Sequence, residues 1–279
     1  MRLLVTGAAG MLGTDVVACA APHDVVALAR TELDVTDADA VREVVRGARP
    51  DAVINCAAWT DVDGAEEAED AATAINGDGA GHVAAAAAAA GAFVVHVSTD
   101  YVFAGDATEP YAEADRTGPR TAYGRSKLAG ERAVAAAAPG GHAIVRTAWL
   151  FGPHGKNFVD TMMRLGAERD ELTVIDDQIG SPTFTGHLAQ ALVTIAETRP
   201  NGVLHVAGGG RCSWYKLARE TFARAGMSVN VRPCTTAEYP LPAPRPAFSV
   251  LGSSRHDHPT LPPWQEGLAA HLAIRKAHA

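Results

Sequence analysis

Tyr123 and Lys127 lie four residues apart in a stretch with helical character, so their side chains share one face of the predicted helix. An ammonium group near a phenol lowers the pKa of that phenol towards the working pH and makes it a usable proton donor. Ser98 and Thr99 end a predicted strand, and the Thr99 hydroxyl can hold a carbonyl beside Tyr123. Exposed Tyr/Lys pairs are common on helices, but this pair follows a hydroxyl-bearing strand end. The pattern therefore favours proton transfer to a carbonyl oxygen.

A glycine-rich turn with Gly7, Gly10 and Gly13 lies between the first predicted strand and the first predicted helix. The first glycine permits a tight turn, the second lets backbone approach a pyrophosphate, and the third allows close helix–sheet packing. The helix N-terminus, at Met11 and Leu12, offers free N–H groups and a positive dipole to phosphate. A glycine-rich turn can exist without a ligand, but this context predicts a bound dinucleotide.

The residues after the second predicted strand indicate which dinucleotide binds. An acidic residue there favours NAD, whereas a nearby cation accepts the 2′-phosphate of NADP. Arg30 occupies this point and predicts NADPH, with a solvent-facing arginine as the alternative. Glu32 keeps NADH open. Asp34 and Val35 follow, where a carboxylate can reach the adenine amino group.

Small residues follow the third predicted strand, where they would let a cofactor pass closely above the sheet. An ordinary strand-to-loop transition explains these residues equally well. The predicted cofactor-binding set is Gly7, Gly10, Met11, Leu12, Gly13, Arg30, Asp34, Val35, Ala57, Ala58 and Lys127.

Taken together, the glycine turn and Tyr-x-x-x-Lys resemble the pattern of extended short-chain dehydrogenases/reductases. Longer strings are more specific and are similar to the dTDP-4-dehydrorhamnose reductase family of nucleotide-sugar 4-ketoreductases. These strings are Val97-Ser98-Thr99-Asp100-Tyr101-Val102-Phe103, Arg146-Thr147-Ala148-Trp149, Asp177-Gln178-Ile179-Gly180-Ser181-Pro182-Thr183, Arg245-Pro246 and Ser249-Val250-Leu251.

The resemblance implies that Thr99, Tyr123 and Lys127 form the catalytic set. Hydride from NADPH would reach C4 of a dTDP-4-keto-6-deoxyhexose while Tyr123 protonates the carbonyl oxygen. Lys127 would hold the ribose and tune Tyr123. The implied product is dTDP-L-rhamnose.

The resemblance also implies a site for the nucleotide sugar. Trp149 offers an apolar wall to a deoxysugar, and Arg245 a bidentate donor to phosphates, although a core tryptophan and a surface arginine fit the same sequence. The implied substrate-binding residues are Thr99, Asp100, Tyr123, Trp149, Asn157, Gln178, Ser181 and Arg245.

Two departures from the family pattern leave the sugar open. Gly252 stands where the family often has Asp or Asn, and the loop after Phe103 is individual. Residues 64–69 lack a strong metal-ligand pattern, so no metal site is predicted and a Mg²⁺ requirement stays open. His96 is expected to be a packed, satisfied histidine, and Cys56 a small buried thiol.

Two alternative functions remain. The first is reduction of another dTDP-4-keto-6-deoxyhexose or a streptose-type sugar in secondary metabolism, because few loop contacts set sugar selectivity. The second is a non-enzymatic regulatory subunit on this fold, like the methionine adenosyltransferase β subunit. Intact Thr99, Tyr123 and Lys127 argue against the second alternative.

Short apolar runs alternate with helical stretches through the first half of the chain. This alternation predicts βαβ units, a parallel sheet and a Rossmann-like doubly wound α/β fold. The predicted strands are 2–6, 25–29, 52–55, 93–98 and 143–146; the predicted helices are 11–20, 38–47, 66–90 with a break near Asn76, and 122–137.

Beyond Trp149 the pattern loosens, with helices predicted at 157–166, 188–198 and 214–225, strands at 172–175 and 203–207, and a turn-rich segment at 176–184. A proline-dense stretch at 240–246 and a final helix after Pro263 follow. We expect an NAD(P)-binding domain over 1–150, to which about 184–207 returns. Residues 151–279 would mainly form a smaller substrate-binding lobe.

Composition excludes several other classes. The 279 residues carry 24 Lys plus Arg against 32 Asp plus Glu, a formal net charge of −8, so a nucleic-acid or anionic-membrane surface is not expected. Four scattered cysteines favour reduced thiols and a cytoplasmic location. Thr6, Asp15 and the glycines interrupt the apolar N-terminus, which argues against a signal peptide. The oligomeric state stays open, a homodimer included.

Overall fold

Six parallel strands form the centre of the computed structural model, which describes residues 1–277. The strand order is β10-β5-β4-β3-β1-β2. Chain order reverses between β1 and β3, and ligands of such sheets bind beyond the strand ends at this switch point. The strands are β1 (Arg2–Thr6), β2 (Asp24–Leu28), β3 (Ala52–Asn55), β4 (Phe93–Thr99), β5 (His142–Thr147) and β10 (Gly202–His205).

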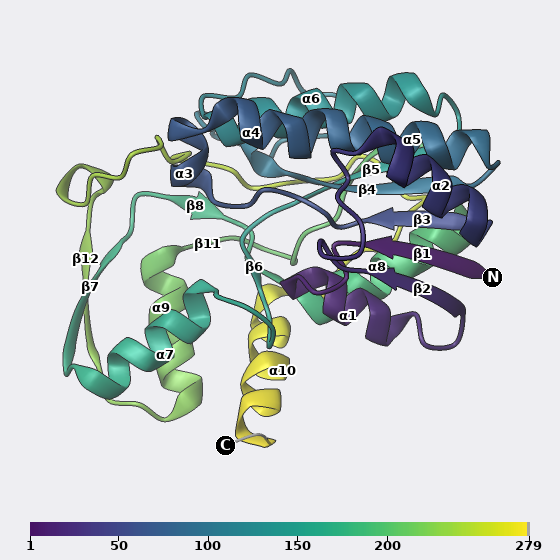
Figure 1. Ribbon diagram of the computed structural model, residues 1–279. Helices are drawn as coiled ribbons and strands as arrows, with labels where there is room; N and C mark the ends of the chain where they lie inside the picture. The colour runs from purple at the N-terminus through teal and green to yellow at the C-terminus, as the bar shows by residue number, and fades with distance from the viewer. Residues whose placement is uncertain (278–279) are drawn as a thin grey trace.

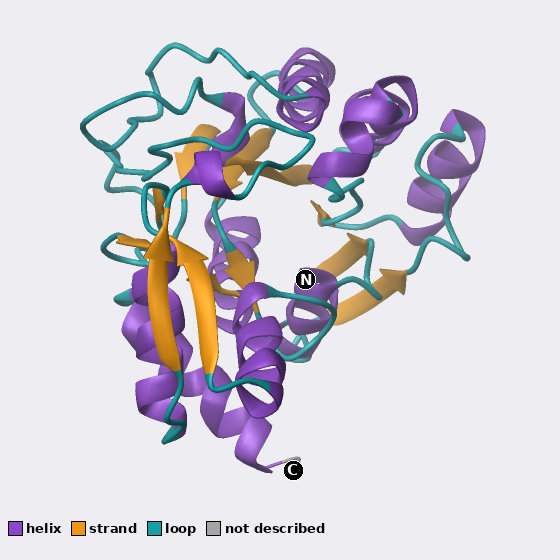
Figure 2. Cartoon of the chain, turned by 90° about the vertical axis from the view of Figure 1, so that its left-hand side faces the viewer, coloured by secondary structure: helices purple, strands orange, loops and turns teal. Residues whose placement is uncertain are grey.

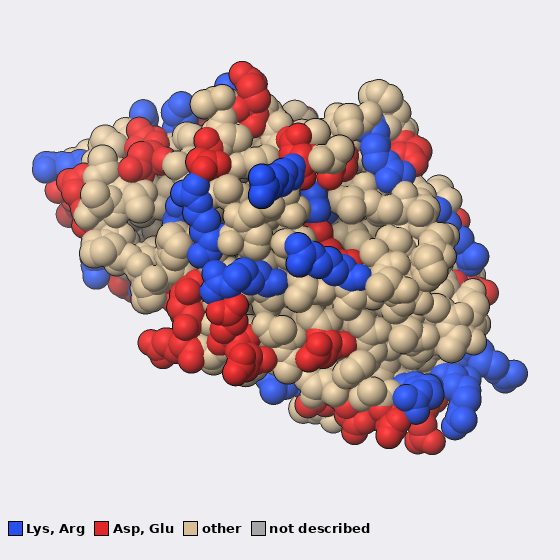
Figure 3. Space-filling view, turned by 90° about the horizontal axis from the view of Figure 1, so that it is seen from above, with Lys and Arg blue, Asp and Glu red and all other residues tan. Residues whose placement is uncertain are grey.

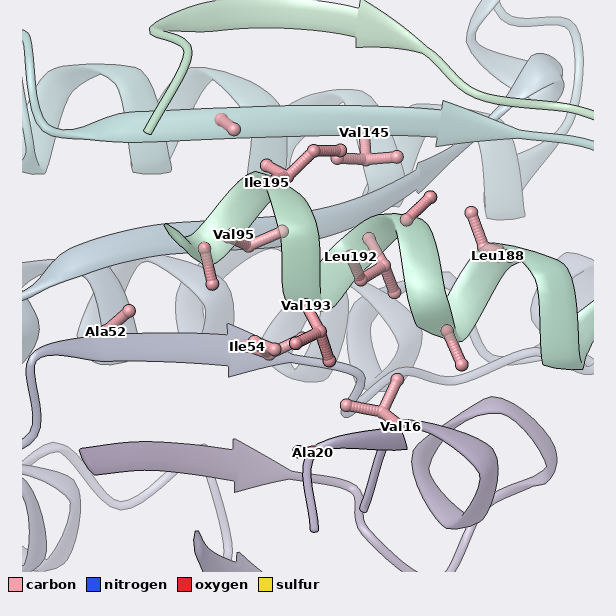
Figure 4. Packing of buried hydrophobic residues seen from close by; sticks show 14 of the residues in the cluster. Val16, Ala20, Ala52, Ile54, Val95, Val145, Leu188, Leu192, Val193 and Ile195 are labelled. Atoms are coloured by element: carbon pink, nitrogen blue, oxygen red, sulfur yellow. The ribbon is translucent and has the colours of Figure 1, made fainter. Parts of the chain in front are cut away.

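Helices cover both faces of this sheet (Figure 1). One face packs against α1 (Met11–Cys19) and α8 (Thr185–Thr198), and the other against α2 (Ala38–Ala48), α5 (Ala80–Ala89) and α6 (Ala122–Ala137). In Figure 4, Leu192 and Ile195 of α8 point towards the strands that carry Val95 and Val145. The predicted doubly wound α/β fold is confirmed.

A second, smaller layer packs beside the sheet layer and consists of later segments (Figures 1 and 2). Here α7 (Phe158–Glu168) and α9 (Trp214–Ala225) pack on a parallel pair, β7 (Glu171–Ile175) and β12 (Asn230–Cys234). The last helix, α10 (Trp264–Ala277), packs against α9. Although α8 and β10 belong to the sheet layer, the division into domains at residue 150 stays a prediction.

Strand β12 was not predicted from the sequence. Pro233 lies inside it and breaks the apolar alternation that begins at Val229. Because β12 pairs only with β7, Pro233 lies in an edge strand, where a residue without an N–H is tolerated.

The helix predicted over 66–90 is broken elsewhere than expected. The break falls at Ala68, between α3 (Val62–Glu67) and α4 (Glu69–Thr73), and the chain continues through Asn76 as a π-helical turn, Ala74–Gly79. The buried Asn76 amide accepts from Trp59 N at 2.8 Å and donates to Trp59 O at 3.0 Å. The wider turn thus supplies a side chain that anchors the loop after β3.

Short elements join the two layers. The segment predicted as turn-rich contains β8 (Ile179–Gly180) and β9 (Thr183–Phe184), which pair with β11 (Cys212–Ser213) and β6 (Leu150–Phe151). Two 3₁₀ turns span Asp100–Val102 and Thr236–Glu238. No helix within residues 1–277 is long and apolar enough to cross a membrane. Basic and acidic side chains are interspersed on the face shown in Figure 3.

Candidate active site

The glycine turn after β1 has room for backbone only. Gly7 has a left-handed φ of +66°, and a Cβ there would lie 2.7 Å from Ala57 N. A Cβ on Gly13 would lie 2.2 Å from the Gly7 carbonyl oxygen, so α1 packs directly on the turn. Gly10 is the N-cap of α1 and has no side chain to bond the first N–H groups. The turn thus lets a ligand come close to the backbone, and the first N–H groups of α1 are left without a side-chain cap. Both properties suit the binding of a dinucleotide pyrophosphate.

Buried polar contacts tie together the strand ends beneath this turn. The Thr6 hydroxyl donates to Asn55 Oδ1 at 2.7 Å, and the same oxygen accepts from Ala57 N at 3.1 Å. Asn55 Nδ2 lies 3.2 Å from His96 Nδ1. Among the described residues His96 Nε2 has no hydrogen-bond partner, so the expectation of a satisfied histidine is only half right. Burial holds the pKa of His96 well below its usual value, which keeps the ring neutral.

The side chains predicted to hold the adenosine end lie on the loop after β2. Arg30 is exposed, and within residues 1–277 it forms no hydrogen bond or ion pair. Asp34 Oδ1 accepts from Thr36 N at 2.9 Å and Thr36 Oγ1 at 2.8 Å, contacts that lower the pKa of this exposed carboxyl. Val35 is buried. Arg30 is therefore free to meet a ligand, and its role stays a prediction.

The predicted catalytic side chains meet where β4 ends against α6. Thr121 caps α6 by accepting from Gly124 N at 2.9 Å, which starts the helix beside the Thr99 hydroxyl. Burial raises the pKa of Tyr123 to about 12, and a hydrogen bond to Thr99 lowers it in part. The structure thus brings Thr99 and Tyr123 together at one point.

Lys127 lies one turn further along α6 and is buried. Its ammonium donates to the Val97 carbonyl at 2.7 Å, and burial lowers its pKa to about 8. The described residues show no hydrogen bond between Lys127 and Tyr123. Lys127 is thus held by β4, next to the strand end that carries Thr99.

Asp100 follows Thr99 directly and is buried. Its carboxyl accepts from the Thr99 hydroxyl at 2.9 Å, and burial raises its pKa to about 6 against hydrogen bonds from Ser249 and Thr99. The neighbouring Tyr101 ring meets Tyr123 edge-on, with centroids 5.6 Å apart. Asp100 therefore orients the Thr99 hydroxyl in this structure, while its predicted substrate contact stays untested.

A cavity of about 630 Å³ lies between α7, α9 and the β7–β12 pair, within the range of small-molecule sites. Trp149 and Trp214 line it as a stacked pair, with ring centroids 3.5 Å apart and planes 5° from parallel. Trp149 has a φ of +48°, and a Cβ on Gly180 would lie 2.3 Å from its ring. A glycine at 180 is thus what allows the stack to form.

Gln178 and Arg245 are two of the polar residues that line this cavity, together with others such as Arg169 and Glu171. Gln178 accepts from Trp214 Nε1 at 3.1 Å and donates to Thr236 Oγ1 at 2.9 Å. Arg245 lines the cavity and pairs with both carboxylate oxygens of Asp63, at 2.9 and 2.7 Å. The structure thus supplies Arg245 with an internal anion in place of the predicted nucleotide phosphates.

Asn157 and Ser181 do not line the cavity. Asn157 caps α7: it accepts from Asp160 N at 2.9 Å and donates to the Gly152 carbonyl at 2.9 Å. Ser181 is buried and donates to Gly210 O at 3.3 Å. Asn157 thus stabilises the start of α7, which forms one wall of the cavity, and the contact of both side chains with a sugar stays a prediction.

Sequence reasoning did not find three residues of this site. Trp214 was predicted only as the start of a helix, Tyr101 only as part of a family string, and Asp63 not at all. An aromatic at the first turn of a helix with a polar remainder could have marked Trp214. The pairing of Asp63 with Arg245 spans 182 positions and leaves no local signal.

No group of three or more His, Cys, Asp or Glu side chains suited to a metal ion occurs within residues 1–277. Two acidic residues of α3 and α4 pair with arginines: Asp63 binds Arg245, and Glu69 pairs with Arg125 at 2.7 Å.

The chain matches known proteins over almost its whole length. A family model described as the RmlD substrate binding domain matches residues 1–276. A dTDP-4-dehydrorhamnose reductase of Streptomyces griseus is 47% identical over 277 residues, covering 96% of this chain and 91% of that protein. A dTDP-4-keto-6-deoxy-D-glucose reductase of Streptomyces niveus is 47% identical over 254 residues, covering 90% of this chain and 88% of that protein.

A solved structure shares both fold and size. The dTDP-4-dehydrorhamnose reductase of Bacillus anthracis, in complex with NADP, matches with a TM-score of 0.93 and 40% identity over 98% of this chain and 99% of that one. The glycine turn, the Thr99–Tyr123 contact and these matches agree. The chain belongs to the dTDP-4-dehydrorhamnose reductase family of NAD(P)H-dependent oxidoreductases.

Proposed function

We propose that this chain reduces the C4 keto group of dTDP-4-dehydro-L-rhamnose to give dTDP-L-rhamnose, with NADPH as the reductant. One observation carries the proposal: the hydroxyls of Thr99 and Tyr123 meet at the end of β4, one helical turn from a buried lysine. Tyr101 connects this point to the tryptophan-lined cavity, because it lines that cavity and contacts Tyr123.

The cofactor site is built from the glycine turn, with the predicted residues Gly7, Gly10, Met11, Leu12, Gly13, Arg30, Asp34, Val35, Ala57, Ala58 and Lys127. When bound, NADPH supplies a hydride to the carbonyl carbon. Neighbouring backbone occupies the space that a Cβ on Gly7 or Gly13 would need, so only glycine fits at these positions. The turn therefore presents bare backbone, which a pyrophosphate can approach. Arg30 forms no hydrogen bond or ion pair within residues 1–277 and has only the nearby Asp34 carboxylate as an electrostatic neighbour, so it would pair with the 2′-phosphate.

The protein supplies the proton. With a pKa of about 12, the Tyr123 phenol is protonated at neutral pH and donates to the sugar oxygen as negative charge develops there. The Thr99 hydroxyl, which donates to Asp100 in this structure, would turn its proton to the same oxygen and hold it in place. Lys127, as an ammonium, stabilises the tyrosinate that remains after proton transfer.

The cavity would hold the nucleotide sugar. The Trp149–Trp214 stack offers an apolar face to the 6-methyl group, and Gln178 a polar edge. Arg245 would release the Asp63 carboxylate and bind a nucleotide phosphate in its place. A guanidinium can form two parallel hydrogen bonds with either group.

A second candidate is reduction of another dTDP-4-keto-6-deoxyhexose, including a streptose-type sugar. The 47% identity to the Streptomyces niveus protein, named for a 4-keto-6-deoxy-D-glucose substrate, favours keeping it. The two candidates share all chemistry at C4 and differ only in the contacts around the ring.

NADPH oxidation with a panel of dTDP-4-keto-6-deoxyhexoses tests the proposal, with the product configuration read by NMR. Preferred turnover of the L-rhamnose precursor supports the first candidate, and preference for another sugar supports the second. No turnover of any sugar favours the regulatory-subunit reading. A homodimer and a cytoplasmic location stay predictions, and light scattering on the purified chain checks the first.

A further inference from the structure

Three side chains follow one another along a single face of α6. Tyr123, Lys127 and Glu131 are spaced at four-residue intervals, which places them in a row. Glu131 and Lys127 are both buried, with 4% and 2% of their surfaces exposed. A buried carboxylate needs partners, so the contacts of Glu131 matter more than those of an exposed helical glutamate.

Each of these side chains engages a consecutive residue at the end of β4. Lys127 donates to the Val97 carbonyl, Glu131 Oε1 accepts from the Ser98 hydroxyl at 2.6 Å, and Tyr123 contacts the Thr99 hydroxyl. The strand end that bears Thr99 is therefore attached to the helix that bears Tyr123 at three points.

Arg146 of β5 fixes the Glu131 carboxylate. Its guanidinium donates from Nε to Oε1 at 2.8 Å and from Nη2 to Oε2 at 2.7 Å. Arg146 is also the register partner of Ser98 on the neighbouring strand, so the Glu131 carboxylate on α6 is bonded by side chains from both β4 and β5. The bidentate geometry leaves the carboxylate little freedom to move.

Glu131 is also the charged neighbour of Lys127. Within residues 1–277, three groups interact electrostatically with the Lys127 ammonium: Cys56, His96 and Glu131. Burial raises the pKa of the Cys56 thiol to about 12 and lowers that of His96 far below its usual value, so both are neutral at working pH. The Glu131 carboxylate, paired with Arg146, raises the pKa of Lys127 against the effect of burial.

We propose that Glu131 is a positioning residue for the reduction: anchored by Arg146, it fixes Ser98 beside Thr99 and supplies the negative charge that the buried Lys127 ammonium faces. The inference rests on the proposed function, because it assigns Glu131 a role through Lys127 and Tyr123. Glu131 itself touches neither the substrate nor the cofactor.

The test compares pH profiles of kcat/KM for wild type, Glu131→Gln and Arg146→Met, with folding checked by circular dichroism. Both variants break the same buried ion pair, but only Glu131→Gln removes the negative charge beside Lys127. The basic limb is the part of the profile where activity falls as the pH rises. We expect Glu131→Gln to move this limb at least about one pH unit lower, since loss of the carboxylate favours neutral Lys127. Arg146→Met keeps the carboxylate, and its basic limb should lie at or above that of wild type.

Glu131→Asp is the conservative control, because it keeps the charge and shortens the side chain by one methylene group. Its basic limb should stay with that of wild type while kcat falls. If both ion-pair variants lower the limb equally, or if neither moves it, Glu131 is only structural and the proposal is overturned. Should Glu131→Gln not fold, Arg146→Met and Glu131→Asp decide, since a lowered limb in either contradicts the charge role. Turnover by wild type separates failure of this inference from failure of the proposed function.

Discussion

The corner where β4 meets α6 and the cavity beside α7 and α9 differ in the chemical character of their residues. The corner holds buried charges and hydroxyls, with Lys127, Glu131 and Arg146 each less than 5% exposed. The cavity is lined mainly by aromatic and aliphatic side chains, including the stacked tryptophans, with polar residues such as Gln178 and Arg245 among them. One helix and two adjacent strands of the sheet position the corner, whereas the cavity combines α7 and β7 with residues from distant parts of the chain, among them Trp149, Trp214 and Arg245.

This difference suggests a division of labour. Charges in a dry environment act strongly on one another and on the reacting atoms, so the corner should govern the rate of the chemical step. Apolar contacts bind substrate and transition state about equally, so the cavity should govern affinity and choice of sugar. Four experiments test that division.

Tyr123→Phe should lower kcat about 1,000-fold, because it removes the proton donor and leaves the ring in place. Binding of NADPH, followed by fluorescence titration, should change little. Tyr101→Phe is the matched control, since that ring contacts Tyr123 but gives no proton to the sugar. Comparable losses in the two variants would remove Tyr123 from its catalytic role.

The pH dependence of kcat/KM in the wild type should show a basic limb near the Lys127 pKa of about 8. Because Lys127 is needed as an ammonium, activity falls as pH rises through that pKa, by about tenfold per unit. Steady-state rates between neutral pH and pH of about 10 measure it. A flat profile over that range would show that the charge on Lys127 is not required.

Trp214→Ala should raise KM for the sugar about tenfold and lower kcat much less, because it removes one partner of the stacked wall. Trp214→Phe, which keeps an aromatic face, should lie between this variant and wild type. An effect confined to kcat would contradict the assignment of the cavity to binding, and would blur its contrast with the corner.

Arg30→Ala should weaken NADPH binding roughly fivefold while leaving NADH binding unchanged, since an exposed ion pair with the 2′-phosphate contributes modestly. Arg42→Ala is a suitable control, because Arg42 is an exposed arginine on nearby α2 that already pairs with Asp39. Isothermal titration with both dinucleotides measures the ratio. Equal losses of NADPH and NADH affinity would show that Arg30 does not bind the 2′-phosphate.

Sequence reasoning served the two regions unequally. The bounds of β1, β3, α6 and α9 were predicted to the residue, because local periodicity and caps define them. The spacing of Tyr123 and Lys127 already implied a shared face, which the helix provides. The Rossmann-like architecture followed from the alternation of strands and helices.

The cavity was harder because its contacts are not local. Trp149 and Trp214 stack across 65 positions of the chain, a separation obtained as 214 − 149. Arg245 has an acidic partner on α3 that no spacing rule could identify. The turn at Asn76 reads as a helix break, yet the buried amide stabilises an enlarged turn by bonding the Trp59 backbone. Tertiary contacts decide such features.

The stacked tryptophans have a practical consequence for following this protein in solution. The chain has four tryptophans, and only two of them are in face-to-face contact within residues 1–277. Indoles this close couple their strongest electronic transitions, so the pair should give an exciton signal in far-ultraviolet circular dichroism that isolated indoles lack. A sugar nucleotide that enters the cavity and tilts either ring would alter that signal without any label. The stacked tryptophans would therefore report, without an added label, whether the cavity is occupied.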